Sequence, residues 1–420
     1  MPFRYQPGSA EFQANPHESF DYMREHMPVY KTPKNYIVLT RFDHVAQTLR
    51  SNKASVQFMD YCTGPAAEYV GKATALREIN PIFAGFKTML RVDDPDHERV
   101  KKLMIPAFSQ SNVMRLSSRL EKVVDSHINK LDNLESVEIL SQVAQEISQD
   151  VVCDIMNIPE VDKEKLCKWT HALTMILEPM YAETEGIENM KKYLPETVEY
   201  LVTEISKRND SPMPDDIVST LLYEEVDGDR LSLLEVISNV GLLFMAGIET
   251  SMYFLSNAIG ALLQDERARA DWLHIIRNAN PGPHMDPKVN NAIEELIRYA
   301  GSVWITGRAA IDDIEYDVDG KTVVVEKGSL INVVMAAANR DPRIFENPHK
   351  LDLYRENAKR NIGFSGGPHY CLGANIAKTV AAMTLTKFFT KFPDAEIVGT
   401  PVWRDRLTFR GLEELNVLLS

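Results

Sequence analysis

One long apolar stretch, from Ser232 to Leu263, constrains the fold of this chain more than any other feature of its sequence. Ser232 is followed three residues later by Glu235, a capping-box pattern that predicts the start of a helix. A helix of roughly 32 residues that rises about 1.5 Å per residue is about 48 Å long. The sequence therefore predicts a single helix that crosses the whole protein.

Helical periodicity also dominates other segments. Apolar residues recur every three or four positions along residues 113–131 and again along residues 137–155, so each segment has one apolar face. Residues 42–50, FDHVAQTLR, are interpreted as a further helix that follows a short strand at residues 36–40.

Three other segments are interpreted as connections. Residues 53–90 carry little periodicity and several Gly and Pro, which predicts a long, partly ordered loop. Residues 205–230 are polar and predict a surface connection. Asp319-Gly320 lies between two β-rich runs and predicts a hairpin.

Together these patterns predict a mainly α fold with small β-sheets. No internal repeat and no dividing linker is found in the 420 residues, so we expect one domain over residues 1–420. Its β-richer part is expected within residues 1–60 and its helical body over residues 61–420. Small sheets are expected near residues 314–335 and 395–420.

Charge and cysteine content argue against several classes of protein. The formal net charge of −14 argues against nucleic-acid binding, which depends on clustered Lys and Arg. The four cysteines form no CxxC pair, which is typical of a reducing compartment. The most apolar run, VGLLFMAGI, is far shorter than a membrane helix, and the first residues show no signal-peptide pattern. We therefore expect a cytoplasmic protein without a membrane anchor.

The densest local signal is the sequence GFSGGPHYCLGA at residues 363–374, where glycines surround Cys371 just before a predicted helix. Backbone N–H groups and the positive end of a helix dipole favour a thiolate at such a place. No second cysteine or histidine at zinc spacing accompanies it. A single shielded thiolate suits axial ligation of haem iron. The alternative is a buried structural thiol, which is the commoner role of a free cysteine.

This loop resembles the signature of the cytochrome P-450 superfamily, which is Phe, two residues, Gly, then x-His-x-Cys-x-Gly. The residues that stand in register are Phe364, Gly367, His369, Cys371 and Gly373. Ser365 stands where glycine is commonest in the family. The resemblance covers essentially the whole chain. It implies the cytochrome P-450 fold, with a long central helix over a buried haem b whose iron is ligated by the Cys371 thiolate.

The stretch AGIETS, in the middle of the long helix, resembles the oxygen-binding groove of that family. The resemblance implies catalytic roles for Glu249 and Thr250 in proton delivery, with Ala246 and Gly247 forming the groove beside them. A carboxylate in an apolar helix is costly unless it is paired or wetted. The alternative interpretation is a core threonine next to a glutamate that points to solvent.

The pair Glu295 and Arg298 resembles the family's ExxR motif. On an exposed helix such a pair contributes only a few tenths of a kcal/mol. The resemblance implies instead that the pair is buried, that Arg355 joins it, and that the three residues have a structural role.

The other haem-binding positions are also implied by the resemblance. His97 matches the family's helix that reaches the haem propionates, and Lys101 stands where the family commonly has arginine. Lysine is a point charge and does not reproduce the paired donors of arginine. Arg308 and His369 are the remaining propionate partners. Two residues of the signature, Phe364 and Gly373, complete the cofactor-binding set.

The reaction implied is that of a haem-thiolate monooxygenase, which uses O₂ to hydroxylate or otherwise oxidise a hydrophobic small molecule such as a secondary metabolite. Because the chain has no dinucleotide-binding fingerprint, electrons are expected from a ferredoxin or flavodoxin with its NAD(P)H reductase. The expected basic patch for that partner consists of Lys101, Lys102, Arg115, Arg119, Lys359 and Arg360. The expected substrate pocket includes Phe244, Met245, Trp304, Ile305 and Thr408.

Three alternatives remain open at this point. The first is haem-thiolate chemistry without hydroxylation, such as phenol coupling. The second is a haem sensor or carrier, against which the Glu249–Thr250 pair argues, because binding alone does not need it. The third is a protein without haem, in which Cys371 is a structural thiol.

Overall fold

The computed structural model describes residues 5–68, 70–71, 87–174, 184–213, 215–279 and 286–419. Helices make up most of this part of the chain. Before residue 175 they are α1 (Ala10–Ala14), α2 (Pro16–His26), α3 (Phe42–Arg50), α4 (Phe58–Tyr61), α7 (Asp96–Phe108), α8 (Gln110–Asn129), α9 (Gln145–Ile155) and α10 (Lys163–Thr174). After residue 183 they are α11 (Thr184–Asp210), α12 (Ile217–Tyr223), α13 (Leu233–Gln264), α14 (Glu266–Arg277), α15 (Pro287–Ala300), α16 (Met335–Ala338) and α17 (Ala374–Lys391).

The strands form three small sheets. One has the order β1-β2-β8-β5-β3, with β2 and β8 parallel and the other neighbours antiparallel. Its strands are β1 (Val29–Lys31), β2 (Ile37–Leu39), β3 (Ala54–Ser55), β5 (Ile305–Ala310) and β8 (Leu330–Val334). The second has the order β4-β10-β9, formed by β4 (Ser136–Glu138), β9 (Glu396–Trp403) and β10 (Leu412–Leu418). The third is the hairpin of β6 (Ile314–Val318) and β7 (Lys321–Val325).

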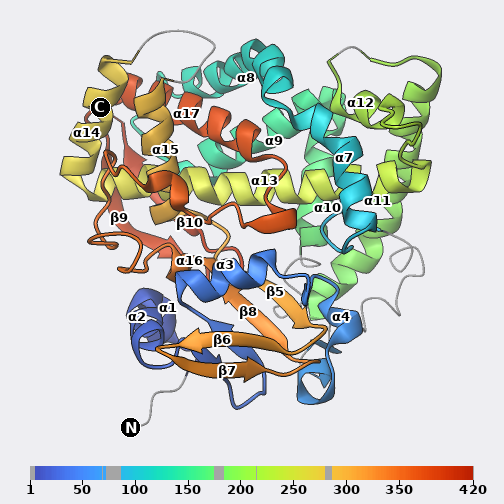
Figure 1. Ribbon diagram of the computed structural model, residues 1–420. Coiled ribbons are helices and arrows are strands. Elements are labelled where there is room, and N and C mark those ends of the chain that lie inside the picture. The colour runs from blue at the N-terminus through green and yellow to red at the C-terminus, as the bar shows by residue number, and fades with distance from the viewer. Residues whose placement is uncertain are drawn as a thin grey trace.

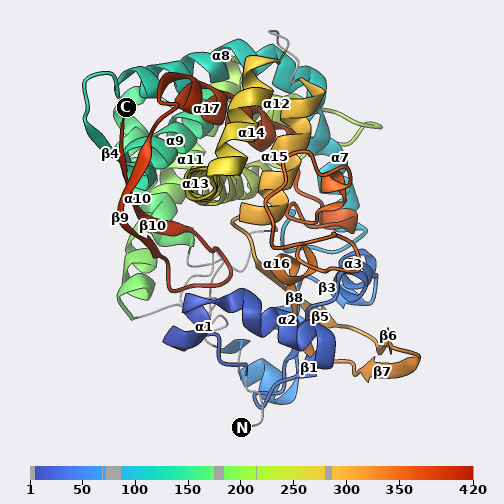
Figure 2. The ribbon, with the colours of Figure 1, turned by 90° about the vertical axis from the view of Figure 1, so that its left-hand side faces the viewer.

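The long helix α13 is the central element, as the sequence predicted. Its first turn has the complete capping box, in which Glu235 N donates to Ser232 Oγ and Ser232 N donates to the Glu235 carboxylate. Figure 2 views α13 nearly end-on, with other helices around it. Among the described helices it is the one long and apolar enough to cross a membrane. However, 56% of its most apolar window is buried, as in the core helix of a folded protein.

Two local predictions are confirmed. The stretch FDHVAQTLR forms α3, directly after β2. Asp319 and Gly320 have φ angles of +55° and +81° and connect β6 to β7. Left-handed backbone at both central positions is what an Asp-Gly turn accommodates. In Figure 1 this hairpin lies with β5, β8, α1 and α2 on one side of the molecule, and the large helices lie on the other.

The prediction of a surface connection over residues 205–230 is wrong. Helix α11 continues to Asp210, and α12 follows within the same segment. Arg208 Nε donates to Asp216 Oδ2 at 2.7 Å, and both side chains are fully buried. The charges that suggested solvated residues thus form a buried ion pair, which the periodicity of the sequence does not reveal.

The N-terminal part holds more helix than predicted. Its short strands β1, β2 and β3 are accompanied by α1, α2, α3 and α4. Inside the predicted loop over residues 53–90, β3 and α4 are followed by helical residues at 64–68. Residue 69 and residues 72–86 of that loop lie outside the described residues.

Candidate active site

A cavity of about 1080 Å³ lies beside the middle of α13. Its wall combines α13, the cysteine loop at residues 363–374, the start of α17 and strand β5. The predicted site residues that line it are Ala246, Gly247, Thr250, Ile305, Arg308, Phe364, His369, Cys371, Gly373 and Thr408. The fold thus brings together residues that lie more than a hundred positions apart in the sequence.

The cysteine loop has a backbone that only a few residue types accommodate. Ser365 and Gly367 both have a φ angle of +65°. A Cβ added to Gly367 would lie 2.3 Å from the backbone oxygen of Leu49 on α3, so this close approach requires glycine. The loop is also closed on itself, because Cys371 N donates to Phe364 O at 3.0 Å. The loop therefore holds Cys371 in a fixed place ahead of α17.

The Cys371 side chain lines the cavity and is accessible from it, although it lies deep within the surrounding protein. Burial within the surrounding protein raises the pKa of its thiol, while the backbone N–H groups of Gly373 and Ala374 and the charge of Lys101 act in the opposite direction. Cations and N–H donors favour the thiolate form of a cysteine. The loop thus offers one thiol that a metal ion inside the cavity can ligate.

A cluster of basic side chains flanks the same side of the cavity. Arg308 and His369 line the wall, and the His97 ring stacks on His369 with centroids 4.0 Å apart. Lys101 Nζ donates to Pro368 O, next to His369. His97 and Lys101 are not among the described residues of the wall itself. They form the layer beside it.

The buried positive charge and the hydrogen-bond donors of this cluster favour the binding of an anion. Burial, together with the positive charges of His97, Arg308 and Lys101, lowers the pKa of His369 to about 3. Burial lowers the pKa of Arg308 to about 10. Nε2 of His97 is buried and has no hydrogen-bond partner among the described residues. Such donors are satisfied by carboxylates, which form charge-assisted hydrogen bonds with them.

These observations fit haem. The cavity supplies one thiol, the cluster supplies donors for two carboxylates, and most of the remaining wall is apolar. The apolar wall residues beside the cysteine loop include Phe108, Val152, Ile297, Ile376, Val380 and Ala381. An apolar wall with a few convergent polar groups is typical of a cofactor site.

The groove on α13 lies across this cavity. Thr250 Oγ1 donates to Ala246 O at 2.6 Å, and Ser302 Oγ donates to Thr250 O at 2.7 Å. Gly247 lets α9 approach closely, since a Cβ there would lie 2.9 Å from Val152 Cγ2. Ala246, Gly247 and Thr250 therefore face the cavity from one helix segment.

Glu249 is placed differently. Its side chain is 2% exposed, so it does not point to solvent as the alternative interpretation supposed. It is also not among the described residues of the cavity wall. A carboxylate buried next to Thr250 is the costly arrangement that the sequence indicated.

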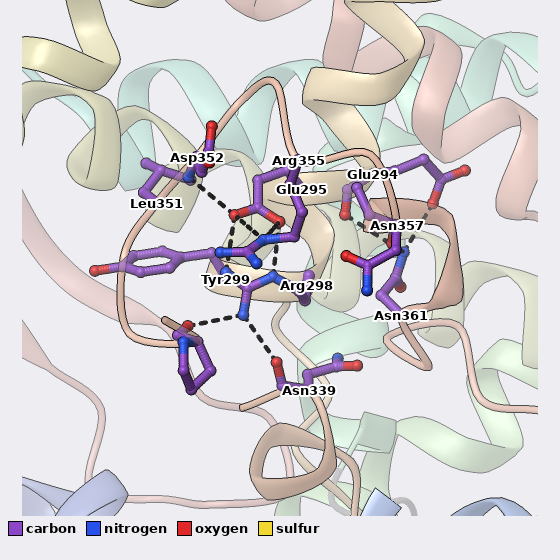
Figure 3. A network of polar contacts seen from close by, with 12 residues as sticks. Glu294, Glu295, Arg298, Tyr299, Asn339, Leu351, Asp352, Arg355, Asn357 and Asn361 are labelled. Carbon is purple, nitrogen blue, oxygen red and sulfur yellow. Dashed lines mark hydrogen bonds and ion pairs between the residues drawn. The ribbon is translucent and has the colours of Figure 1, made fainter. Parts of the chain in front are cut away.

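The predicted structural triad is assembled, as Figure 3 shows. Arg298 donates to both carboxylate oxygens of Glu295, at 2.7 and 2.8 Å, and Arg355 Nε lies 3.1 and 3.2 Å from the same two oxygens. Glu295 and Arg298 have no exposed side-chain surface. Arg298 also donates to the backbone oxygens of Asn339 and Pro348, so the triad ties α15 to the segments that precede the cysteine loop.

The five residues predicted for the substrate pocket are divided between the cavity wall and the protein core. Ile305 and Thr408 line the cavity, whereas Phe244, Met245 and Trp304 lie outside its described wall. Phe244 is 4% exposed and belongs to the main core, and Met245 packs on a small cluster with Leu173, Met190 and Leu194. Trp304 stacks on His17 with ring centroids 4.9 Å apart. These three apolar side chains are packing residues, which is the commoner role of such residues.

Sequence reasoning also missed a large part of the wall. Residues from the N-terminal segment and from the sheet reach the cavity, namely Tyr5, Pro7, Pro33, Lys34, Tyr36, Phe58, Leu330 and Asn332. None of them belongs to a recognisable motif. They reach the site only because segments that lie far apart in the sequence from the cysteine loop and α13 pack around the same cavity.

The predicted basic patch is largely paired. Lys102 lies 2.5 Å from an Asp227 oxygen, and Arg115 lies 2.9 Å from Asp215. Arg119 pairs with Asp154 at 3.0 Å. With Lys101 bound to Pro368 O, four of the six predicted cations already have partners within the chain.

Comparisons with known proteins agree with this geometry. The family model described as "Cytochrome P450" matches residues 11–396. The chain is 28% identical over 428 residues to the "Polyketide biosynthesis cytochrome P450 PksS" of Bacillus subtilis strain 168, covering 99% of this chain and 98% of the relative. The structure of that relative has a TM-score of 0.83 and covers 99% of this chain and 100% of its own.

Two further relatives extend the similarity. "Cytochrome P450 107B1" of Saccharopolyspora erythraea is 31% identical over 386 residues, which are 90% of this chain and 88% of that protein. The structure of P450BioI in complex with an acyl carrier protein ligated to hexadec-9Z-enoic acid has a TM-score of 0.82 and 26% identity, and covers 98% of this chain and 100% of its own. The chain described here therefore belongs to the cytochrome P450 family of haem-thiolate monooxygenases.

Proposed function

We propose that this chain binds haem b through the Cys371 thiolate and uses O₂ to hydroxylate, or otherwise oxidise, a hydrophobic small molecule. The observation that carries this proposal is the position of Cys371. Its thiol lines a mostly apolar cavity that is also lined by Thr250 and Ala246 of α13. Haem bound there supplies the activation of O₂ and the transfer of one of its oxygen atoms.

Four side chains are proposed to hold the cofactor carboxylates. Arg308 and His369 donate from the cavity wall, and His97 and Lys101 donate from the layer beside it. Phe364 and Gly373 complete the binding loop. Gly373 leaves open space, since a Cβ there would meet no atom within 4 Å.

Thr250 and Glu249 are proposed to move protons. Because the Thr250 hydroxyl donates to Ala246 O, its oxygen remains an acceptor toward the cavity that it lines. Glu249 is buried one position earlier and is the nearest carboxylate along α13. We assign proton supply to Glu249 and proton placement at the reacting oxygen to Thr250, with Ala246 and Gly247 shaping the groove.

The substrate class follows from the wall and from the relatives. The cavity wall also includes the apolar residues Val70, Met89, Leu242, Phe254, Leu407 and Phe409, which favours a hydrophobic substrate. One similar protein is named for polyketide biosynthesis, and another similar structure holds an acyl chain on a carrier protein. We propose a polyketide-like or acyl-chain secondary metabolite.

Electrons are proposed to come from a ferredoxin or flavodoxin with its NAD(P)H reductase, in the cytoplasm. Bacterial members of this family use redox partners. Lys359 and Arg360 lie in the turn Ala358–Arg360, shortly before the cysteine loop. They are the cations that we assign to partner docking, because Lys102, Arg115 and Arg119 are paired with acidic residues.

The test is the ferrous–CO spectrum of the purified holoprotein. The wild type is expected to show the band of thiolate-ligated haem, and Cys371→Ser to lose it. Cys62→Ala, which removes a different free thiol that is buried, is expected to keep it. A thiolate band that survives in Cys371→Ser would refute the ligand assignment.

A substrate titration then tests the proposed class. Polyketides and carrier-linked acyl chains are expected to convert the ferric haem from low to high spin. If only phenols or terpenes do so, the substrate class is wrong while the haem assignment stands.

A further inference from the structure

We propose that Asp94 is a positioning residue for the cofactor carboxylate. It accepts a hydrogen bond from Nδ1 of His97, so that His97 works as an imidazolium whose Nε2 donates to that carboxylate. This inference rests on the proposed function, since the carboxylate is that of bound haem. His97 is the residue that touches the cofactor, and Asp94 acts through it.

The contact between the two side chains is direct. Asp94 Oδ1 lies 3.2 Å from Nδ1 of His97, one helical turn apart in sequence. The Asp94 side chain is 54% exposed, whereas that of His97 is 2% exposed. The exposed carboxylate thus reaches inward to a buried ring.

The backbone around this contact is anchored. His97 N donates to Asp93 O at 2.9 Å. The Asp93 carboxylate accepts from Ser55 Oγ at 2.5 Å and from Val56 N at 3.1 Å, which ties the segment to β3. The backbone on both sides of Asp94 is therefore held, and the contact with Asp94 Oδ1 fixes the partner of one nitrogen of the His97 ring.

The second ring nitrogen determines the charge state. Nε2 of His97 is buried and has no partner among the described residues, and one face of the ring is covered by His369. A neutral imidazole that donates from Nδ1 has only a lone pair at Nε2. It could not donate to a carboxylate. A histidine that donates a hydrogen bond to an ionised carboxylate from each of its two ring nitrogens must carry a proton on both.

The charged groups around His97 explain why protonation and cofactor binding are coupled. Burial and the charge of Lys101 lower the pKa of His97 in the protein alone, while Asp94 and Asp93 raise it. His369 and Arg308 add positive character on the cavity side. A cofactor carboxylate adds a negative neighbour and raises the pKa of His97, so binding takes up a proton above the pKa of the unbound state.

The sign of the pH dependence follows from this coupling. The bound carboxylate makes the pKa of His97 higher in the holoprotein than in the protein without haem. The stabilisation of bound haem is therefore fully present at low pH and is lost as pH rises through the pKa of the holoprotein. Asp94 contributes part of the raised pKa. Removing its charge therefore moves the loss of haem to lower pH.

The experiment measures haem release from the holoprotein to excess apomyoglobin, between about pH 5 and pH 8 where a histidine titrates. Asp94→Ala is expected to release haem about tenfold faster near neutral pH, because a charge-assisted contact is lost. The pH midpoint of release is expected to fall by about one unit. Asp94→Asn keeps an acceptor oxygen without the charge, so the midpoint falls while the rate at low pH stays near that of the wild type.

A matched control is Asp96→Asn. Asp96 is 56% exposed in the same segment and pairs with Lys87 at 3.2 Å instead of with His97. It loses the same charge and is expected to keep the wild-type profile. If the two Asp94 variants also keep the wild-type midpoint, or release haem faster without any change of midpoint, the inference is overturned.

Failure of the proposed function is distinguishable from failure of the inference. Absence of the thiolate ferrous–CO band in the wild type would overturn both. A normal band in every variant, with unchanged pH midpoints, would overturn the role of Asp94 alone.

Discussion

The buried ion-pair network around Glu295 allows a quantitative prediction. Glu295 accepts from Arg298, Arg355 and the backbone N–H of Asp352, and its carboxylate has no exposed surface. Glu295→Gln removes the charge that two buried guanidinium groups share. Breaking a buried pair from one side costs about 3–5 kcal/mol, because the remaining charge is left uncompensated. That is a large fraction of the roughly 5–15 kcal/mol by which a folded protein is stable.

The matched control is an exposed pair. Arg230 and Glu225 lie 2.6 Å apart, but their side chains are 54% and 47% exposed. Glu225→Gln should lower the free energy of unfolding by less than about 1 kcal/mol, since solvent screens such pairs. Both variants are unfolded in urea. Their urea midpoints are compared with that of the wild type, provided that the dependence of the unfolding free energy on urea concentration is unchanged. Equal losses in the two variants would refute the reasoning that burial makes the Glu295 network costly to break.

Three further predictions concern the site and its surroundings. Thr250→Ala should keep haem but divert electrons to hydrogen peroxide, so product formed per NADH should fall; an unaltered yield would contradict the proton-placing role. Burial, together with the charge of Arg340, holds the pKa of His17 well below its ordinary value. As the pH drops, the unfolded chain therefore binds a proton at His17 before the folded protein does. Stability should therefore fall as pH drops below about 6.5, by up to about 1.4 kcal/mol per pH unit, and His17→Gln should remove that part of the slope in urea unfolding at several pH values. Gly367→Ala should reduce haem content and lower the melting temperature, because its Cβ would meet Leu49 O at 2.3 Å; Gly399→Ala, also at positive φ but with no atom within 4 Å, should affect haem content little.

Short motifs were the most predictable part of the molecule. The Asp319-Gly320 turn, the capping box at Ser232 and the helix FDHVAQTLR formed as expected. Each depends on backbone requirements and hydrogen bonds within a few residues, which the local sequence specifies. The cysteine loop belongs to this group, because its left-handed positions and its thiol lie within one short segment.

Long-range packing was not predictable in the same way. Phe244 and Ile305 are both apolar, yet one belongs to the main core and the other lines the cavity. Arg208 and Asp216 looked like solvated charges, but they pair in the interior. In each case the side chain type fits both outcomes, and only the neighbouring elements decide between them.

The sequence by itself determined the chemistry of this protein and the length of its central helix. The glycine-rich loop indicates Cys371 by residue type and position, whereas the donors His97, Lys101, Arg308 and His369 and the Glu249–Thr250 pair are implied by the resemblance to the cytochrome P-450 family. The tertiary structure decided which of them meet. It places the His97 ring against that of His369, buries Glu249 outside the described wall, and completes the cavity with residues of the N-terminal segment and of strand β8. The physical reason is that hydrogen bonds and turns are local, whereas the shape of a cavity depends on how distant elements pack together.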